Sequence, residues 1–385
     1  MEGFLRDSFA RVPARWRAER NDDLLSLADV DTILTGSGLR RPSIRLVRDG
    51  VVLDPATWTR RARTGSVWVD DVIHPGKVLD HFAAGATIAL QGLHRWWPDL
   101  TILCRQLEIE LGHPVQANAY LTPAGAAGLA PHHDTHDVFV LQVSGTKSWI
   151  VREPVLAAPL PRQRSDHDEA GRQPVLFEAD LQPGDCLYLP RGFVHSARAQ
   201  SGVSLHLTLG VLATTASDVL RRLVDATAED PLFRRTMPAG FGTDPAVATE
   251  AVKEVVTQFL GWLSHVDAGE VARGLVRSFG ANRQPLLAGQ LHEVARLDRL
   301  DDDTAVTLRP GTVWHLDLAG DRMTVTTGDR TIELPAVLEV AVRRLLDGDA
   351  ATVGSLSDLL DEPSRLVLVR RLVREGLLRT SGVAA

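Results

Sequence analysis

The sequence predicts an α+β protein in which a central β-rich region lies between two mainly helical regions. Short β-branched and aromatic runs, separated by Gly, Pro and Asp, fill residues 115–210 and are typical of an all-β sandwich or barrel. After residue 212, apolar residues return at three-to-four spacing, which indicates amphipathic helices. From about residue 296, two short strands followed by three helices predict a small winged-helix-like module.

The length and composition fit a folded protein of two or three domains. The 385 residues are 44% hydrophobic and 24% charged, so a wholly disordered chain is excluded. The net charge of −7 gives no global reason to expect a nucleic-acid partner. Cys104 and Cys186 are too few for a disulfide framework or a cysteine zinc site. No signal peptide and no apolar run of membrane length is apparent, so we expect a cytoplasmic protein with reduced thiols and no membrane association.

The N-terminal third combines helical and hairpin patterns. Apolar residues within 1–35 recur at helical spacing. Residues 41–53 alternate around the turn signal Asp49-Gly50, which predicts a β-hairpin. Residues 71–112 favour helix, with a short apolar break at 86–90.

The central region predicts at least six strands. Each is a run of four to eight residues rich in β-branched and aromatic side chains and bounded by turn formers. They cover residues 115–121, 137–143, 147–153, 174–179, 185–189 and 204–211.

The C-terminal half predicts a helical region and then the winged-helix-like module. Apolar stripes mark helices over 216–227 and 247–263, whose apolar faces need a partner. The module has strands at 313–319 and 322–327 and helices at 336–346, 355–360 and 364–375. Residues 301–385 hold 10 basic and 14 acidic side chains, a net charge of −4. We therefore do not expect direct DNA binding by this module, because groove readers carry a basic face.

A cluster of histidines precedes one of the predicted strands. If residues 132–136 continue that strand, His132, Asp134 and His136 share one face, and His133 points the other way. An imidazole and a carboxylate on one face can bind a divalent metal. A third ligand is available 61 residues after Asp134, where a strand ends in a Pro-Arg-Gly turn that presents His195. Two histidines and one carboxylate are the ligands of non-haem Fe(II) oxygenases. His133 and His136 stay rival ligands on this reasoning.

Lys147 lies 13 residues after Asp134, on the next predicted strand. A lysine buried in an apolar sheet needs an anionic partner, and the carboxylate of a cosubstrate would provide one. The alternative is a solvated lysine at the edge of a hairpin.

Several of these segments resemble one family. The runs at 85–98, 116–154, 184–197 and 204–211 are similar to the JmjC-type ribosomal oxygenases, also called the cupin-4 family, and the match is dense over about 70–212. The resemblance implies a double-stranded β-helix (jelly-roll or cupin) catalytic domain with N-terminal helical elements over 1–212. It also implies a helical dimerisation region over 213–295 and the winged-helix-like domain over 296–385.

The resemblance also implies an activity. Members of the family are Fe(II)- and 2-oxoglutarate-dependent dioxygenases that hydroxylate arginine or histidine side chains of ribosomal proteins. His132, Asp134 and His195 match the iron ligands, and Lys147 matches the residue that binds the distal carboxylate of 2-oxoglutarate. Expected cofactors are thus Fe(II), 2-oxoglutarate as cosubstrate, and O2. Expected partners are a polypeptide substrate, such as a ribosomal protein, and a second copy of the chain in a homodimer.

Further positions are expected to line the site. The resemblance places Asn118, Tyr120 and Thr208 there, His206 shares the face of Thr208, and strand parity adds His136. Gly210 stands where some relatives have serine, which weakens a transfer of their histidine specificity. Two other functions remain open at this point: an oxygenase of small molecules or natural-product peptides that uses the same site, and a non-catalytic cupin-like regulatory protein.

Overall fold

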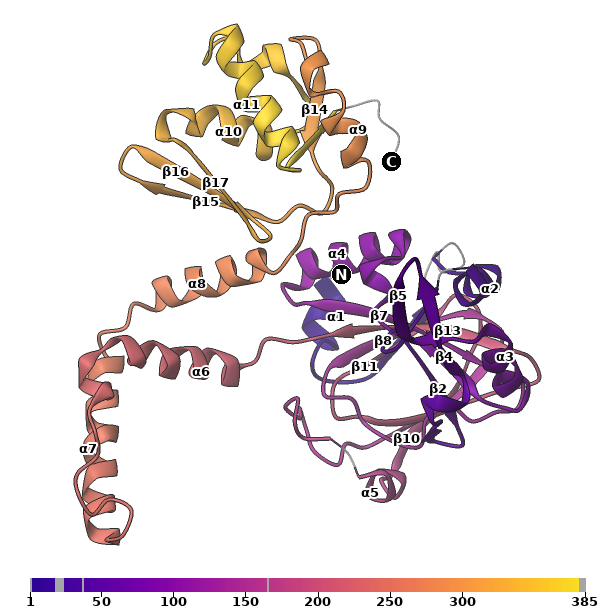
Figure 1. Ribbon diagram of the computed structural model, residues 1–385. Helices are drawn as coiled ribbons and strands as arrows, with labels where there is room; N and C mark the ends of the chain where they lie inside the picture. Colours follow the sequence, from indigo (N-terminus) through magenta and orange to yellow (C-terminus); the bar gives the residue numbers. More distant parts are fainter. Residues whose placement is uncertain (1, 18–23, 37, 165, 381–385) are drawn as a thin grey trace. The chain divides into compact units, whose positions relative to one another are not determined.

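The computed structural model describes residues 2–17, 24–36, 38–164 and 166–380. The chain divides into two compact units, Met1–Ala213 and Thr214–Ala385, and each is described here by itself (Figure 1). The last five residues of the predicted winged-helix-like region lie outside the described residues. None of the helices within the described ranges is both long and apolar enough to cross a membrane.

Two antiparallel sheets form the centre of the first unit. The larger has the order β1-β11-β8-β13-β7-β6-β2-β3, and the smaller has the order β10-β9-β12. The larger sheet contains β1 (Ala14–Arg17), β2 (Ile44–Arg48), β3 (Val51–Val52), β6 (Thr87–Leu90), β7 (Val115–Thr122), β8 (Asp137–Ser144), β11 (Asp185–Leu189) and β13 (Ser204–Val211). The smaller contains β9 (Lys147–Arg152), β10 (Val175–Leu181) and β12 (Val194–Ala199).

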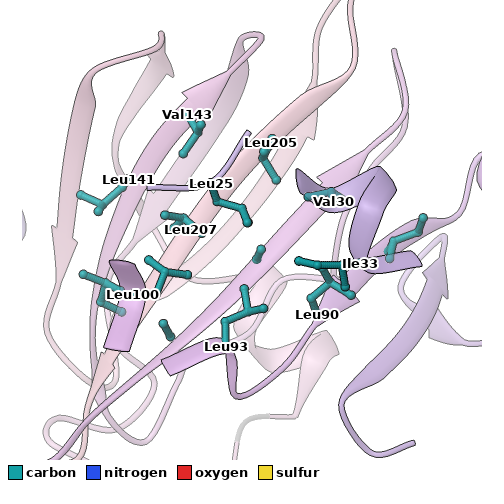
Figure 2. Close-up of a cluster of buried hydrophobic side chains, with 14 of the residues drawn as sticks. Leu25, Val30, Ile33, Leu90, Leu93, Leu100, Leu141, Val143, Leu205 and Leu207 are labelled. Atoms are coloured by element: carbon teal, nitrogen blue, oxygen red, sulfur yellow. The ribbon is translucent and has the colours of Figure 1, made fainter. Parts of the chain in front are cut away.

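The larger sheet buries one face under helices. Figure 2 shows Leu205 and Leu207 of β13 among the leucine and valine side chains of this core. The helices that cover it are α2 (Leu27–Gly36), α3 (Pro75–Ala83) and α4 (Pro98–Leu111). Because side chains alternate along a strand, His206 and Thr208, which alternate with Leu205, Leu207 and Leu209, point to the opposite face. That face looks toward the smaller sheet, and a second apolar cluster, which includes Val140 and Val151, packs between the two.

The remaining elements of the first unit lie at its edges. They are α1 (Glu2–Asp7), η1 (Pro55–Thr57), the hairpin β4 (Thr59–Thr64) and β5 (Val67–Ile73), η2 (Leu93–Arg95) and α5 (His167–Gly171).

The six central strands and the hairpin around Asp49-Gly50 are confirmed, within a residue or two at their ends. The helical interpretation of 71–112 is wrong in part. Its first residues belong to β5, and the break at 86–90 is the buried strand β6, which pairs with β2 on one side and β7 on the other. A buried strand that pairs on both sides reads as a continuous apolar run, without the alternation that marks a half-buried strand.

The second unit holds the helices α6 (Ala216–Ala226), α7 (Pro245–Leu263) and α8 (Ala268–Ala281), followed by a region with its own core. The two helices predicted over 216–227 and 247–263 are confirmed, and α8 is an additional one. The short turns η3 (Thr227–Glu229) and η4 (Pro231–Arg234) lie in the connection between α6 and α7.

Two three-stranded sheets, β18-β14-β19 and β15-β16-β17, pack with helices around the C-terminal core. The strands are β14 (Ala305–Leu308), β15 (Trp314–Ala319), β16 (Arg322–Thr327), β17 (Arg330–Pro335), β18 (Ala351–Thr352) and β19 (Leu378–Thr380). The helical elements are α9 (Gln290–Val294), η5 (Leu297–Arg299), η6 (Ala336–Leu338), α10 (Glu339–Leu346), η7 (Val353–Leu356) and α11 (Glu362–Arg374).

Candidate metal centre and cosubstrate pocket

A cavity of about 540 Å³ lies between the two sheets of the first unit. Its lining side chains come from β2, β6, β7, β8 and β13 on one side and from β9 and β12 on the other. They include the three predicted metal ligands and Lys147. The cavity is of the size that small-molecule and cofactor sites usually have.

Three of the lining side chains form a potential metal site. Each of His132, Asp134 and His195 offers one ligand atom, and these atoms lie within 4.8 Å of one another. The Nε2 atom of His195 lies 3.6 Å from a carboxylate oxygen of Asp134. The main chain holds the two histidines together, because each donates its backbone N–H to the carbonyl of the other, at 3.2 and 2.8 Å. Ligands far apart in the sequence are therefore fixed by paired backbone hydrogen bonds.

Both histidines present the nitrogen that a metal needs. The Nδ1–H of His132 donates to the carbonyl of Ala130 at 2.7 Å, and the Nδ1–H of His195 donates to the carbonyl of Phe193 at 3.1 Å. A carbonyl only accepts, so the proton is fixed on Nδ1 and the lone pair of Nε2 is free. Burial and the nearby His132 lower the pKa of His195 to about 4, which keeps its imidazole neutral, as metal binding requires.

The local structure of the motif differs from the strand that the sequence predicted. Residues 132–136 are irregular, apart from the bridge at His132, and β8 starts at Asp137. Strand parity therefore does not separate His136 from His133, and both histidines line the cavity. His195 is likewise not carried by a turn at a strand end, because it is the second residue of β12.

Asp137 ties the two ligand segments to each other. Its carboxylate accepts hydrogen bonds from the Tyr188 hydroxyl at 2.6 Å and from the Arg191 backbone N–H at 2.9 Å. The next residue in that loop, Gly192, donates its N–H to the carbonyl of Asp134 at 3.0 Å. Gly192 has a φ of 95°, and a Cβ there would collide with Leu156, so the loop requires glycine.

Lys147 lines the cavity and is buried, with 2% of its surface exposed. Its ammonium donates to the Thr122 hydroxyl at 2.9 Å and to Nδ1 of His206 at 3.4 Å. Burial lowers the pKa of Lys147 to about 7. The solvated edge position considered for this lysine is excluded, and a neighbouring anion would restore the charged form.

Aromatic rings hold His206 beside this lysine. The imidazole stacks on Tyr120, with ring centroids 5.0 Å apart and planes at 7°, and meets the edge of Trp149 at 5.4 Å. Burial and the adjacent Lys147 hold the pKa of His206 well below its usual range. The neutral ring accepts from Lys147 through Nδ1 and keeps its proton on Nε2.

Comparison with known proteins places this site in a family. Residues 94–219 match the JmjC domain family. The chain is 32% identical over 266 residues to the bifunctional lysine-specific demethylase and histidyl-hydroxylase NO66 of Dictyostelium discoideum, covering 63% of this chain and 51% of that protein. It is 33% identical over 241 residues to human ribosomal oxygenase 1, covering 57% of this chain and 34% of that protein. Residues 94–219 of this chain are therefore a JmjC domain, and the chain is similar over part of its length to the ribosomal oxygenases.

The solved structures agree on the fold of this JmjC-domain protein. The crystal structure of the ribosomal oxygenase YcfD of Escherichia coli aligns over 99% of this chain and 98% of its own, with a TM-score of 0.56 and 17% identity. A further structure of YcfD contains cobalt and 2-oxoglutarate, with a TM-score of 0.55 and the same coverage. The expected α+β architecture with a cupin-type JmjC domain is therefore confirmed. The chain spans about half or less of the length of the curated relatives above.

The JmjC domain brings most of the predicted lining residues together. Tyr120, His136, His206 and Thr208 all line the cavity. Asn118 shares their strand face but is absent from the described cavity wall, and its side-chain oxygen accepts from the backbone N–H of Gly92 at 2.9 Å.

Gly210, the position where some relatives have serine, faces His136. A Cβ at Gly210 would lie 3.2 Å from Nε2 of His136, so the imidazole fills the space beside it. The pairing of a histidine at 136 with a glycine at 210 is thus a local feature of this JmjC domain.

Sequence reasoning missed several lining side chains of the cavity, among them the polar and aromatic residues Arg45, Trp149, Arg164 and His167. Trp149 was open to prediction, because it lies two residues after Lys147 and so shares its strand face. Arg45 lies on β2, and no local pattern connects it with residues 75 or more positions later. Arg164 and His167 belong to the connection between β9 and β10, where the sequence has no regular period.

Proposed function

We propose that this chain is an Fe(II)- and 2-oxoglutarate-dependent dioxygenase that hydroxylates an amino-acid side chain, an arginine or histidine of a ribosomal protein. The observation that carries the proposal is the cavity that holds two histidines with free Nε2 atoms, a carboxylate and a buried lysine. Two of the relatives are a histidyl-hydroxylase and a ribosomal oxygenase by name, and one structure of YcfD contains cobalt and 2-oxoglutarate.

The residues present fit the metal and the cosubstrate. His132, Asp134 and His195 would hold Fe(II) through two nitrogens and one oxygen, which leaves coordination positions open. Lys147 would bind the distal carboxylate of 2-oxoglutarate, since its buried ammonium has two neutral partners and no anion among the described residues. Fe(II) with 2-oxoglutarate and O2 supplies oxidative decarboxylation coupled to insertion of one oxygen atom into a C–H bond.

The protein's own contribution is orientation and exclusion of water. The carbonyls of Ala130 and Phe193 orient the two imidazoles, and Thr122 with His206 orients the lysine. Tyr120, His136 and Thr208 would face the substrate, together with Asn118 at the margin. The buried sheet face keeps bulk water from the reacting centre, which favours coupling of cosubstrate oxidation to hydroxylation.

Formation of succinate from 2-oxoglutarate tests the proposal. The purified protein is expected to release succinate only with Fe(II), 2-oxoglutarate and O2 together, and His132→Ala should abolish it. His81→Ala, at a half-buried histidine of α3 that is not on the cavity wall, is the matched control and should leave the rate unchanged. Intact succinate release by His132→Ala would contradict the ligand assignment.

The substrate is tested separately. Ribosomal proteins from cells with and without this gene are compared by intact mass, and one of them should gain a single oxygen atom when the gene is present. Stimulation of succinate release by a free amino acid or small peptide, with no modified ribosomal protein, would favour the small-molecule function instead.

The second unit supports two further proposals. We propose that α6–α8 mediate homodimerisation, because apolar side chains on them stay exposed in the single chain: Leu220, Val224, Val252, Val256, Leu260 and Val276. We also propose that the C-terminal core forms a winged-helix-like domain. Light scattering of the wild type and of Leu260→Asp tests the dimer, which the aspartate should dissociate.

We further propose a cytoplasmic location, which is supported by two buried cysteines that form no disulfide. Cell fractionation with a specific antibody would test it.

A further inference from the structure

Cationic side chains outnumber anionic ones on the cavity wall. Counting side chains that the structure describes and that are ionised near neutral pH, the wall carries Arg45, Lys147 and Arg164 against one carboxylate, Asp134. Asp134 belongs to the proposed metal site, and Lys147 would be matched by the distal carboxylate of 2-oxoglutarate. The doubly charged metal is balanced by Asp134 and the cosubstrate's other carboxylate. Two guanidinium groups thus remain without a matching anion.

Arg45 is the half-buried member of this pair, whereas Arg164 is exposed at the mouth. It lies on β2 in register with Ala89 of β6, which is in turn in register with Tyr120 of β7. Tyr120 is also in register with His206 of β13. Because residues in register across neighbouring strands point to the same face of a sheet, Arg45 lies on the same face as His206, which contacts Lys147. The guanidinium is therefore placed in the cavity by strand register.

The hydrogen bonding of Arg45 is incomplete. Its Nε–H is buried and has no acceptor in the described part of the chain. The guanidinium charge lies close enough to the buried Tyr120 hydroxyl to favour its ionised form, so it lowers the pKa that burial raises, and this hydroxyl is a second potential donor on the wall. Trp149 adds a third donor on the same wall, since its Nε1–H is also buried without an acceptor. A buried donor without an acceptor is costly, so a wall of such donors suits a ligand rich in acceptor oxygens.

We propose that Arg45 and Tyr120 form a substrate subsite that binds an acceptor oxygen, a carboxylate or amide carbonyl, and that excludes cationic side chains from the cavity. This inference rests on the proposed function, because the charge balance assumes a bound metal and 2-oxoglutarate. It narrows that function: of the two residues proposed above, the neutral histidine is retained and the cationic arginine is excluded. An arginine substrate would place a guanidinium against Arg45 with no carboxylate to offset the repulsion.

Ligand-observed NMR with small probes tests this subsite without turnover. The probes are the N-acetyl amides of glutamate, glutamine and arginine, and binding is read by saturation transfer from the protein loaded with 2-oxoglutarate under argon. The glutamate and glutamine probes should bind at least about tenfold more tightly than the arginine probe, the difference expected for one charge-assisted hydrogen bond. Added Mn(II) should then broaden the bound probe's side-chain protons, which shows that the probe lies near the metal.

Variants of Arg45 give the decisive comparison. Arg45→Gln should weaken binding of the glutamate probe about tenfold, so that this probe no longer binds more tightly than the arginine probe. Arg45→Lys should keep part of the difference in affinity between the two probes. Arg48→Gln is the matched control, because Arg48 lies on the same strand but not on the cavity wall. Melting temperatures of all variants show whether the fold is intact, and Arg45→Lys serves if Arg45→Gln unfolds.

The outcomes separate this inference from the proposed function. Equal or tighter binding of the arginine probe to the wild type, or no binding by any probe, overturns the subsite. An Arg45→Gln variant that keeps the wild-type preference also overturns it. If Mn(II) does not bind while the probes still discriminate, the metal assignment fails and the subsite stands.

Discussion

Two parts of the cavity are built in different ways: the metal corner, formed by His132, Asp134 and His195, and the lysine corner, formed by Lys147, Thr122 and His206. His132 and His195 are oriented by main-chain carbonyls two residues before each of them, in segments that depart from regular strands or lie next to a loop. Lys147 and His206 lie within regular strands, and side chains from neighbouring strands hold them. The difference suggests that metal geometry is fixed by the backbone, whereas the cosubstrate site depends on individual side chains that can be changed one at a time.

The largest expected effect lies at the metal corner. His195→Ala should weaken binding of Mn(II) or Fe(II) by more than about a hundredfold, because one of three ligands is lost. Isothermal titration under anaerobic conditions measures this. His136→Ala is the control from the same cavity and should change the affinity less than about threefold. A large loss of metal affinity in His136→Ala would make His136 a rival ligand again.

At the lysine corner, Lys147→Met should nearly abolish 2-oxoglutarate binding while stabilising the protein. The loss of the cation should raise the dissociation constant about a hundredfold or more. Removal of a buried ammonium that has no anionic partner should increase the free energy of unfolding by about 1–4 kcal/mol. Titration calorimetry and urea denaturation of the cosubstrate-free protein give the two values. A destabilised Lys147→Met variant would show that the lysine is structural.

Asp137 connects the two metal-ligand segments to each other, and its substitution tests whether the backbone fixes the metal geometry. In Asp137→Asn, an NH2 group replaces one of the two acceptor oxygens and the carboxylate charge is lost, so the hydrogen bonds to the Tyr188 hydroxyl and the Arg191 N–H weaken and the loop should loosen. We expect about tenfold weaker metal binding and a lower melting temperature. Tyr188→Phe removes one donor but leaves the carboxylate, so its effect on metal affinity should be smaller. An unchanged affinity in Asp137→Asn would mean that the histidines are held independently of this loop.

The pH dependence of cosubstrate binding separates the corners further. In the free protein the pKa of Lys147 is lowered to about 7 by burial, and a bound carboxylate would raise it. Below pH 7 the dissociation constant of 2-oxoglutarate should be constant. Above pH 7 binding must take up a proton, so the constant should rise about tenfold per pH unit. Lys147→Arg should abolish this slope, because a guanidinium stays charged.

The lowered pKa of Lys147 also makes the stability of the protein depend on pH. Whereas cosubstrate binding weakens as the pH rises, stability should increase. Between about pH 7 and 10.5 the unfolded lysine holds a proton that the folded lysine has lost, so the stability of the cosubstrate-free protein should rise with pH in that window.

The smallest effect is expected at His206. His206→Leu removes the acceptor for Lys147 and should weaken 2-oxoglutarate about three- to tenfold, with metal affinity unchanged. His206→Asn returns an acceptor oxygen near the position of Nδ1 and should recover part of the loss. If both variants lose the same amount of affinity for 2-oxoglutarate, His206 acts through packing against Tyr120 and Trp149 and not through the hydrogen bond.

The sequence predicts these two corners unequally, for physical reasons. The triad and Lys147 lie in short motifs, so residue type and spacing were enough to find them. The conformation of 132–136 was mispredicted because a bridge to β12, made by residues far along the chain, decides it. Arg45 was missed because strand register across β2, β6 and β7 brings it to the cavity, and a single sequence does not show register. The central strands were found because alternation or apolar runs are local properties, whereas β12 follows a Pro-Arg-Gly loop that hides its start.

The reciprocal backbone bonds between His132 and His195 have a consequence for folding. They join two segments of the chain that are separated by most of the central strands, and a metal held by both side chains would act as a removable cross-link across that span. Such a link favours the native state over the unfolded chain by mass action, and the stabilisation grows with the logarithm of the free metal concentration once that exceeds the dissociation constant. Resistance of the first unit to heat and proteolysis should therefore report how much metal the surroundings offer.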